Sequence, residues 1–120
     1  MKLVIAATGA SGSIYLQRLL DQVDPSAHEI HLVMSGHAKQ VAKQELGALK
    51  IPKSIAQHRE NDLNVPFVSG SARFDAMVIV PCSMATLGRI ASGYRADLVA
   101  FQPDNIGIIE TWVAGGATAR

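Results

Sequence analysis

The stretch Thr8-Gly9-Ala10-Ser11-Gly12-Ser13 decides the fold of this sequence. It follows a mostly apolar run, residues 2–7, that is typical of a buried strand. It precedes apolar side chains that share one helical face at the spacing i, i+3, i+4 and i+7: Leu16, Leu19, Leu20 and Val23. The pattern predicts a strand, a glycine turn and a helix. Because the first N–H groups of a helix have no partner within it, we expect this turn to contact a phosphate-bearing cofactor.

The two glycines of the turn favour a mononucleotide over a dinucleotide. Gly9 and Gly12 supply only part of the G-x-G-x-x-G pattern that binds dinucleotides, and a tight strand-to-helix turn explains such a pair equally well. An NAD site also needs an acidic residue at the end of the second strand, whereas Asp24 comes before that strand begins. We therefore interpret the turn as a mononucleotide site.

The composition is that of one globular domain. The chain has 120 residues, and its 48% hydrophobic and 18% charged residues indicate a buried interior rather than disorder. A net charge of +1 without basic blocks argues against nucleic-acid binding. Cys82 is the only cysteine, so an internal disulfide is impossible, which fits a reducing compartment. No apolar run has the length of a signal-peptide core or a membrane span, and we expect a cytoplasmic protein without a membrane partner.

Two further strand-to-helix junctions carry hydroxyl groups. Residues His28–Met34 are typical of a second strand, and Ser35 takes the N-cap position of a second helix. The apolar run Ala76–Val80 predicts a central strand covered on both faces, and Pro81–Leu87 leads from it into a third helix. Helical crossovers imply parallel strands, so we predict an α/β fold with a doubly wound sheet. Ligands bind outside the carboxyl ends of such strands, which is the edge where all three junctions lie.

Glu45 is the most informative charged residue of the second helix. At 100° per residue it falls in the middle of an apolar stripe made of Ala38, Val41, Ala42, Leu46 and Leu49. A lone buried carboxylate is costly unless it is paired or hydrogen-bonded. Glu45 is therefore either a carboxylate aimed into a site for acid–base or charge-stabilising work, or a residue that lies beyond the core or bonds a backbone group.

Residues 50–75 form an irregular connection, in which we expect a short strand around Ser54–Gln57. His58 and Arg59 are as compatible with a solvated surface loop as with a functional one. Cys82 fits a small buried residue beside a strand end better than a nucleophile, because the sequence places no base near it.

The three junctions together resemble the flavin prenyltransferase family, which supplies prenylated flavin to partner decarboxylases of ubiquinone and aromatic-acid metabolism. The resemblance extends from residue 1 to about Leu98, and its combination of motifs is specific. The matching segments are Thr8–Gly12 with Tyr15, Leu32–Ser35, Glu45, Val68–Ser71, Asp75–Ile79, Pro81–Leu87, Ile90–Ala91 and Gly93.

This resemblance implies a Rossmann-like, flavodoxin-related three-layer sandwich with a parallel sheet, and an FMN enzyme that assembles into a homo-oligomer. Such an enzyme joins a dimethylallyl group, from dimethylallyl phosphate or diphosphate, to N5 and C6 of reduced FMN. Glu45 corresponds to an active-site carboxylate of the family, and with Ser11 it is the catalytic candidate. By position, the resemblance assigns FMN contacts to all three junctions: Gly9, Ala10, Ser11, Ser35 (phosphate end), and Ser83, Met84, Ala85 and Thr86 (far side).

The last 20 residues depart from the family pattern. The family continues with an arginine for FMN, a second glutamate and the residues that hold the substrate phosphate, and residues 101–120 do not match them. We expect residues 1–100 to form the N-terminal part of a flavoprotein domain with a truncated sheet. In the divergent segment we expect a short strand within 106–113 and a loose tail over 115–120.

Two other functions stay open. One is another FMN-dependent decarboxylase of the same fold, of the coenzyme A or lantibiotic type, which depends on a catalytic histidine. His37 and His58 are the candidates, and neither lies in a matching motif. The other is a non-catalytic flavin-binding fragment, which the missing phosphate-binding residues favour.

Overall fold

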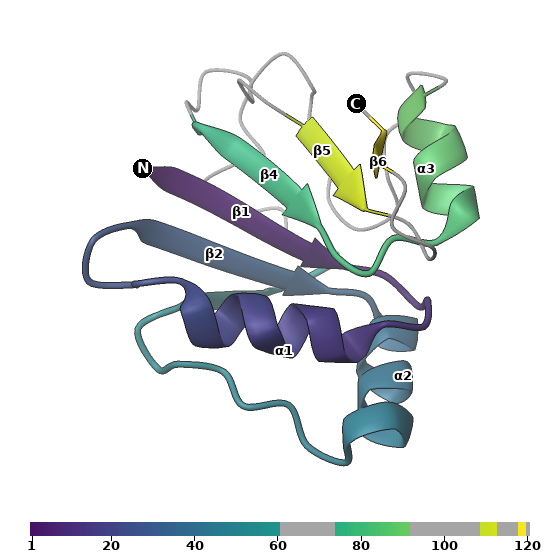
Figure 1. Cartoon of the computed structure of the whole chain (residues 1–120), viewed down its shortest axis with the longest axis horizontal. Coiled ribbons are helices and arrows are strands. Elements are labelled where there is room, and N and C mark those ends of the chain that lie inside the picture. The colour runs from purple at the N-terminus through teal and green to yellow at the C-terminus, as the bar shows by residue number, and fades with distance from the viewer. Residues whose placement is uncertain (61–73, 92–108, 113–117, 120) are drawn as a thin grey trace.

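One six-stranded sheet carries the fold of the computed structural model, which describes residues 1–60, 74–91, 109–112 and 118–119. The strands lie in the order β3-β2-β1-β4-β5-β6; all neighbours from β3 to β5 are parallel, and β6 is antiparallel to β5. The elements in chain order are β1 (Lys2–Ala7), α1 (Ser13–Gln22), β2 (Glu29–Met34), α2 (Gly36–Leu46), β3 (Ala56–Arg59), β4 (Ala76–Ile79), α3 (Met84–Ala91), β5 (Ile109–Trp112) and β6 (Thr118–Ala119) (Figure 1).

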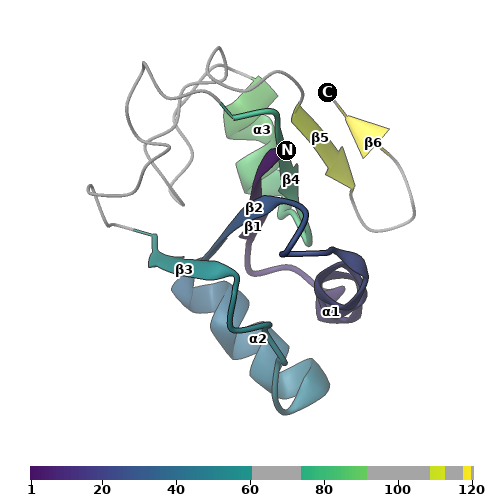
Figure 2. The ribbon, with the colours of Figure 1, turned by 90° about the vertical axis from the view of Figure 1, so that its left-hand side faces the viewer.

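Helices cover both faces of this sheet. The chain runs outward from β1 through β2 to β3 and then resumes with β4 on the other side of β1, so β1 and β4 flank the topological switch point. Right-handed crossovers place α1 and α2 on one face and α3 on the other, as Figure 2 shows. The predicted Rossmann-like three-layer α/β sandwich is confirmed. Within the described ranges, no helix is long and apolar enough to cross a membrane.

The core explains the apolar runs that predicted the strands. Alternate residues of a strand point to opposite faces, and both faces are covered here, so Val4, Ile5, Ala6 and Ala7 of β1 are all fully buried. The face toward α1 and α2 packs strand residues against helix residues: Ile5, Ala7, Ile30, Leu32 and Met34 against Leu16, Leu20, Ala38 and Ala42. The predicted stripe on α1 therefore faces the core, with Leu19 and Val23 at its partly buried edge.

Most predicted boundaries agree with the structure. Helix α1 ends before the turn that starts at Asp24, whose carboxylate accepts a hydrogen bond from the Ser26 N–H at 3.0 Å. The Oγ of Ser35 accepts from the Ala38 N–H at 3.0 Å and caps α2, as predicted. Strand β3 begins slightly later than expected, and β5 lies within the predicted range.

The prediction of a loose tail over 115–120 is wrong for its last part. Thr118 and Ala119 pair with Trp112 and Thr111 as strand β6, because an edge strand offers unpaired backbone groups to a returning chain. Val68–Ser71 and Gly93, which carry part of the family resemblance, lie outside the described residues.

The packing of α1 predicts that two of its apolar residues differ greatly in how much their truncation lowers the free energy of unfolding. Leu20 is 1% exposed between α1 and the sheet, whereas Ile14 on the same helix is 43% exposed. We expect Leu20→Ala to lower the free energy of unfolding by about 2–5 kcal/mol. The matched variant Ile14→Ala should change it by about 0.5 kcal/mol or less. Urea unfolding checks both, and equal effects would contradict the described core.

Candidate functional site

Three strand-to-helix junctions meet at the carboxyl edge of the sheet. The first (residues 8–13) follows β1, the second (35–37) follows β2 and the third (81–86) follows β4. The Ser35 N–H donates to the Ala7 carbonyl at 3.1 Å, and the Thr8 N–H donates to the Pro81 carbonyl at 3.0 Å. Both neighbouring junctions are thus hydrogen-bonded to the end of β1. The prediction that the three junctions share one edge is confirmed.

The glycines of the first junction serve two different purposes. Gly12 adopts φ 115°, a left-handed conformation that favours glycine, at the N-cap position of α1. At Gly9 the constraint is space, because a Cβ built there would lie 2.5 Å from the Cβ of His37. The first and second junctions therefore touch at Gly9. Ser11, between the glycines, is exposed at this edge, and Ala10 is half-buried.

Glu45 does not lie in the core, although the helical spacing puts it in the middle of the apolar stripe. The residue is exposed in the last turn of α2. Its Oε1 accepts hydrogen bonds from the Gly12 N–H at 3.2 Å and the Ser13 N–H at 3.0 Å. The periodicity identified the helix face correctly, since Ala38 and Ala42 are buried, but the long side chain reaches sideways to the start of α1. The bond to backbone N–H groups, one of the alternatives left open, is observed, and the structure does not test the catalytic alternative.

The first junction therefore binds an anion, and in this structure the anion is the protein's own carboxylate. Two of the N–H groups that we expected to be available to a phosphate are occupied by Glu45. The backbone N–H of Ser13 is the main cause that holds the pKa of Glu45 below its usual value of 4.5. Glu45 is thus a carboxylate fixed beside the first junction.

In the third junction, hydroxyl groups order the start of α3. Ser83 Oγ accepts from the Thr86 N–H at 3.2 Å and donates to Thr86 Oγ1 at 2.9 Å. The Leu87 N–H donates to the Ser83 carbonyl at 3.0 Å. Thr86 is 8% exposed, whereas Met84 and Ala85 are exposed. The predicted site residues Ser83–Thr86 are therefore a hydrogen-bonded cap whose middle two side chains face outward.

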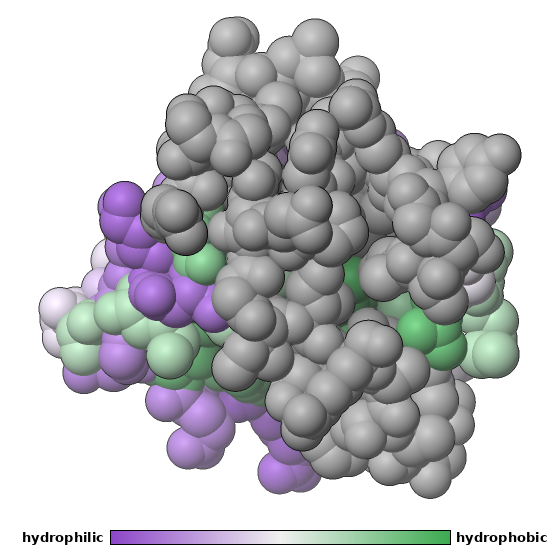
Figure 3. All heavy atoms as spheres, turned by 90° about the horizontal axis from the view of Figure 1, so that it is seen from above, coloured by the Kyte–Doolittle hydropathy of each residue, from purple (hydrophilic) through white to green (hydrophobic). Residues whose placement is uncertain are grey.

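Exposed apolar side chains surround these junctions. Ile14 and Tyr15 at the start of α1 are 43% and 66% exposed, and Met84 at the start of α3 is 72% exposed. In Figure 3 hydrophobic atoms show at the right-hand end, toward which the strands point in Figure 1, whereas hydrophilic and moderately hydrophobic atoms are mixed at the opposite end. The candidate site thus combines hydroxyl and N–H groups with an apolar rim.

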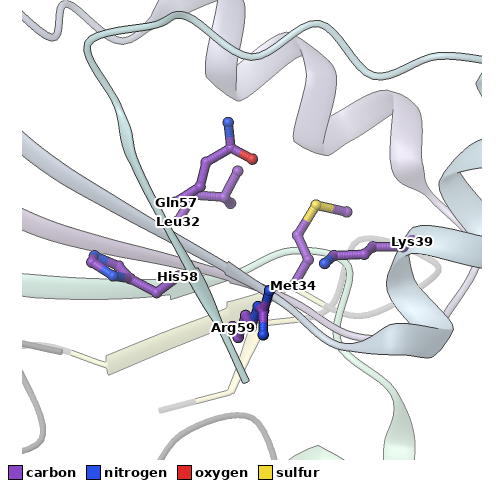
Figure 4. Close-up of a pocket in the computed structure, with 6 residues that line it drawn as sticks. All are labelled: Leu32, Met34, Lys39, Gln57, His58 and Arg59. Carbon is purple, nitrogen blue, oxygen red and sulfur yellow. The ribbon is translucent and has the colours of Figure 1, made fainter. Parts of the chain in front are cut away.

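A separate hollow of about 130 Å³ lies at the sheet edge between β2, β3 and α2 (Figure 4). Leu32 and Met34 contribute apolar side chains to it, and Lys39 and Arg59 contribute positive charges. Of the candidate residues, His58 lines it, and none of the residues predicted to contact FMN does. The hollow is therefore distinct from the three junctions.

The two candidate histidines lie in different places. His58 is hydrogen-bonded to His31 at 2.8 Å between Nε2 and Nδ1, on strands β3 and β2. His37 lies against Gly9 in the second junction. Only His37 is therefore placed beside the candidate site.

Thr8 and Pro81 join the site through contacts that sequence reasoning missed. The Thr8 hydroxyl donates to the Pro81 carbonyl at 2.9 Å, a contact between residues 73 positions apart. No local pattern points to such a bond. One signal in the sequence could have pointed to Thr8. It carries a hydroxyl and directly follows a strand at the sheet edge where ligands bind in such folds.

The Glu45 contact predicts how stability depends on pH. Because the pKa of Glu45 is lower in the folded chain than its usual 4.5, the carboxylate stabilises the fold above that pH, and the stabilisation is lost as pH falls through the folded pKa. Wild type should therefore be more stable than Glu45→Gln near neutral pH, and the difference should shrink below about pH 4.5. Urea unfolding from about pH 3 to 7 measures it. A difference that is constant with pH would contradict the contact.

Burial predicts an unreactive cysteine. Cys82 is 5% exposed, and burial raises the pKa of its thiol to about 11. Because the thiolate is the reactive form, alkylation by iodoacetamide at about pH 8 should be much slower for the folded chain than for the urea-unfolded chain. Equal rates would show that the thiol is accessible and ionised.

Comparison with known proteins finds flavin prenyltransferases among the relatives of this chain. The chain is 46% identical over 102 residues to the flavin prenyltransferase UbiX of Methanocaldococcus jannaschii, which is 82% of this chain and 55% of that protein. It is 38% identical over 102 residues to the flavin prenyltransferase UbiX of Thermoplasma acidophilum, 82% of this chain and 56% of that protein. The chain thus spans about half the length of the curated relatives it matches.

Solved structures show the same fold. A UbiX protein (AnUbiX, PadA1) in complex with FMN and dimethylallyl pyrophosphate has a TM-score of 0.69 and 38% identity, covering 82% of this chain and 54% of that one. A dodecameric FMN-dependent Ubix-like decarboxylase from Escherichia coli O157:H7 has a TM-score of 0.62 and 34% identity, covering 80% of this chain and 55% of that one. A sequence model of the Flavoprotein family matches residues 1–104. Since that match runs from the first residue through all three junctions, the chain belongs to the Flavoprotein family.

Proposed function

We propose that the chain is a flavin prenyltransferase, which transfers a dimethylallyl group to reduced FMN. The observation that carries the proposal is the meeting of three hydroxyl-bearing junctions at one sheet edge, in a chain similar to flavin prenyltransferases over this same region. The ligands present in the similar solved structure, FMN and dimethylallyl pyrophosphate, are the candidates for this chain.

The residues of the junctions fit FMN by their chemistry. Phosphate and the polar edge of the flavin ring accept hydrogen bonds, and hydroxyl groups at helix starts are suitable donors. The chain offers such groups in each junction, namely Ser11, Ser35 and Thr86, whereas the Ser83 hydroxyl already donates to Thr86 Oγ1. The exposed Ile14, Tyr15 and Met84 suit the apolar part of the ring or a dimethylallyl group. Since Glu45 occupies the start of α1, we assign the phosphate end to Ser35 rather than to Gly12 and Ser13.

Two residues beside the site have proposed roles in the reaction: Glu45 in proton transfer or charge stabilisation, and Ser11 in orienting the reacting groups. When bound, reduced FMN supplies the nucleophilic ring atoms, so the chain itself needs no covalent nucleophile. Glu45 is held ionised by the Ser13 and Gly12 N–H groups, and so it acts as a proton acceptor or a stabiliser of positive charge rather than as a proton donor. Ser11 lies exposed beside it and orients the reacting groups.

The proposal extends to the donor substrate, the partner protein and the assembly of the chain. Dimethylallyl phosphate or diphosphate is the proposed donor, and the product serves a partner decarboxylase that depends on prenylated flavin, in ubiquinone or aromatic-acid metabolism. We propose that residues 1–100 act as the flavoprotein domain in a cytoplasmic homo-oligomer. The dodecameric relative and the exposed apolar rim support the assembly.

A decarboxylase of the same fold is the second candidate. The observation that favours it is the contact of His37 with Gly9, which places an imidazole beside the first junction. Incubation with reduced FMN and dimethylallyl phosphate separates the two, because only a prenyltransferase converts the flavin. Flavin binding without conversion would favour the second candidate.

FMN binding tests the site with matched serine variants. Ser11 lies in the first junction, whereas Ser26 is exposed in the turn after α1, where its hydroxyl donates to Asp24 Oδ1 at 2.6 Å. We expect Ser11→Ala to weaken FMN binding by about fivefold to tenfold, the loss of one hydrogen bond. Ser26→Ala should leave it unchanged. Titration of flavin fluorescence measures both, and no saturable binding by wild type would refute the proposed site.

Turnover tests the role of Glu45. We expect Glu45→Gln to retain FMN binding and to lose at least about 100-fold in prenylation rate, as for removal of an acid–base group. Glu29→Gln, an exposed carboxylate at the start of β2, is the matched control and should keep the wild-type rate. The rate is followed by the absorbance change of the flavin with dimethylallyl phosphate. An unchanged rate for Glu45→Gln would exclude Glu45 from the reaction.

A further inference from the structure

The hydroxyl of Thr8 is buried between the first and third junctions. The residue is 3% exposed, and its Oγ1 donates to the Pro81 carbonyl at 2.9 Å. The same oxygen accepts the Ser83 N–H at 2.6 Å. One hydroxyl thus uses its donor and an acceptor position at the same time, toward two residues of the third junction.

Backbone pairing alone does not reach Ser83. The Val80 N–H donates to the Ala6 carbonyl at 2.8 Å, and the Thr8 N–H donates to the Pro81 carbonyl at 3.0 Å. The backbone hydrogen bonds between β1 and β4 therefore continue past the ends of both strands. After Pro81 the chain turns toward α3, and the next link between the junctions is the Thr8 side chain. Thr8 therefore fixes where Ser83 lies relative to the glycine turn.

The position of Thr86 depends on the position of Ser83. Ser83 Oγ exchanges hydrogen bonds with the Thr86 N–H and with Thr86 Oγ1, at 3.2 Å and 2.9 Å. A shift of Ser83 would therefore move the whole cap of α3. Since a site that contacts one ligand from two sides depends on the distance between those sides, such a shift would reduce affinity for the ligand.

We propose that Thr8 is a positioning residue of the flavin site, which sets the separation of the first and third junctions through the Pro81 carbonyl and the Ser83 N–H. This inference rests on the proposed flavin function. Thr8 itself lies behind the turn, and it acts on the ligand through Ser83 and Thr86.

Three variants test the role of Thr8. Thr8→Val keeps the branched shape and removes the hydroxyl, whereas Thr8→Ser keeps the hydroxyl. Gln17→Leu is the matched control, because the hydrogen bonds that it removes among the described residues lie away from the junctions: two to the Lys50 backbone, at 2.9 Å and 2.8 Å, and one to Asp21 at 2.9 Å. The measurements are the dissociation constant for FMN, from fluorescence titration, the visible circular dichroism of bound FMN, and the midpoint of urea unfolding.

We expect Thr8→Val to weaken FMN binding by about tenfold and to change the dichroism of the bound flavin, since a hydrogen bond to a buried group is lost. Thr8→Ser should bind within about threefold of wild type. Gln17→Leu should lower the unfolding midpoint and leave FMN affinity unchanged. A merely structural role of Thr8 would instead lower the midpoint alone, as in the control, and that result would overturn the proposal.

Hydrogen exchange of the wild-type chain gives a test that needs no variant. The Ser83 amide should exchange slowly with and without FMN, because its N–H is bonded to Thr8 Oγ1. Fast exchange at Ser83 would overturn the inference. Absence of FMN binding by wild type would overturn the proposed function and the inference with it, whereas wild-type binding that Thr8→Val leaves intact would overturn the inference alone.

Discussion

The hydrogen bonds at the end of β1 are the constraint on which the rest of the structure depends. The Ala7 carbonyl accepts the Ser35 N–H, and Thr8 bonds the Pro81 carbonyl, so one short segment holds the chain after β2 and the chain after β4. Parallel pairing of β1 with both neighbours brings three helix starts to one edge. The glycines then let these segments approach each other, as Gly9 and His37 do. A site of three junctions is therefore a consequence of the strand order.

Glu45 places a negative charge at this carboxyl edge of the sheet. A helix start attracts an anion, and the carboxylate from the end of α2 satisfies two N–H groups of α1. This contact joins the two helices on one face of the sheet and keeps the carboxylate ionised beside the glycine turn. The same feature thus stabilises the fold and supplies a charged group for chemistry. In the proposed flavin site, we expect it also to direct a bound phosphate away from α1, toward the second junction.

The repeating patterns of the sequence predicted the helices and strands. Features that depend on contacts between distant residues could not be predicted from it. Continuous apolar runs and helical spacing located β1, α1, β2 and α2, because each depends on residues close together in the chain. The position of Glu45 stayed open between two alternatives, since periodicity gives the face of a helix and not where its end lies relative to a neighbouring helix. Thr8 was missed as a site residue because its partners lie 73 and 75 residues away. The pairing of Thr118 with β5 likewise has no local signal.

The central claim is that the three junctions, joined at the end of β1, form a flavin site in the 120-residue chain. The most direct measurement is the change of backbone amide chemical shifts when FMN is added to the isotope-labelled chain. We predict that the largest changes fall on residues 9–13, 35–37 and 83–86 together. Changes confined to the separate hollow around Lys39 and Arg59, or no changes at all, would contradict the claim.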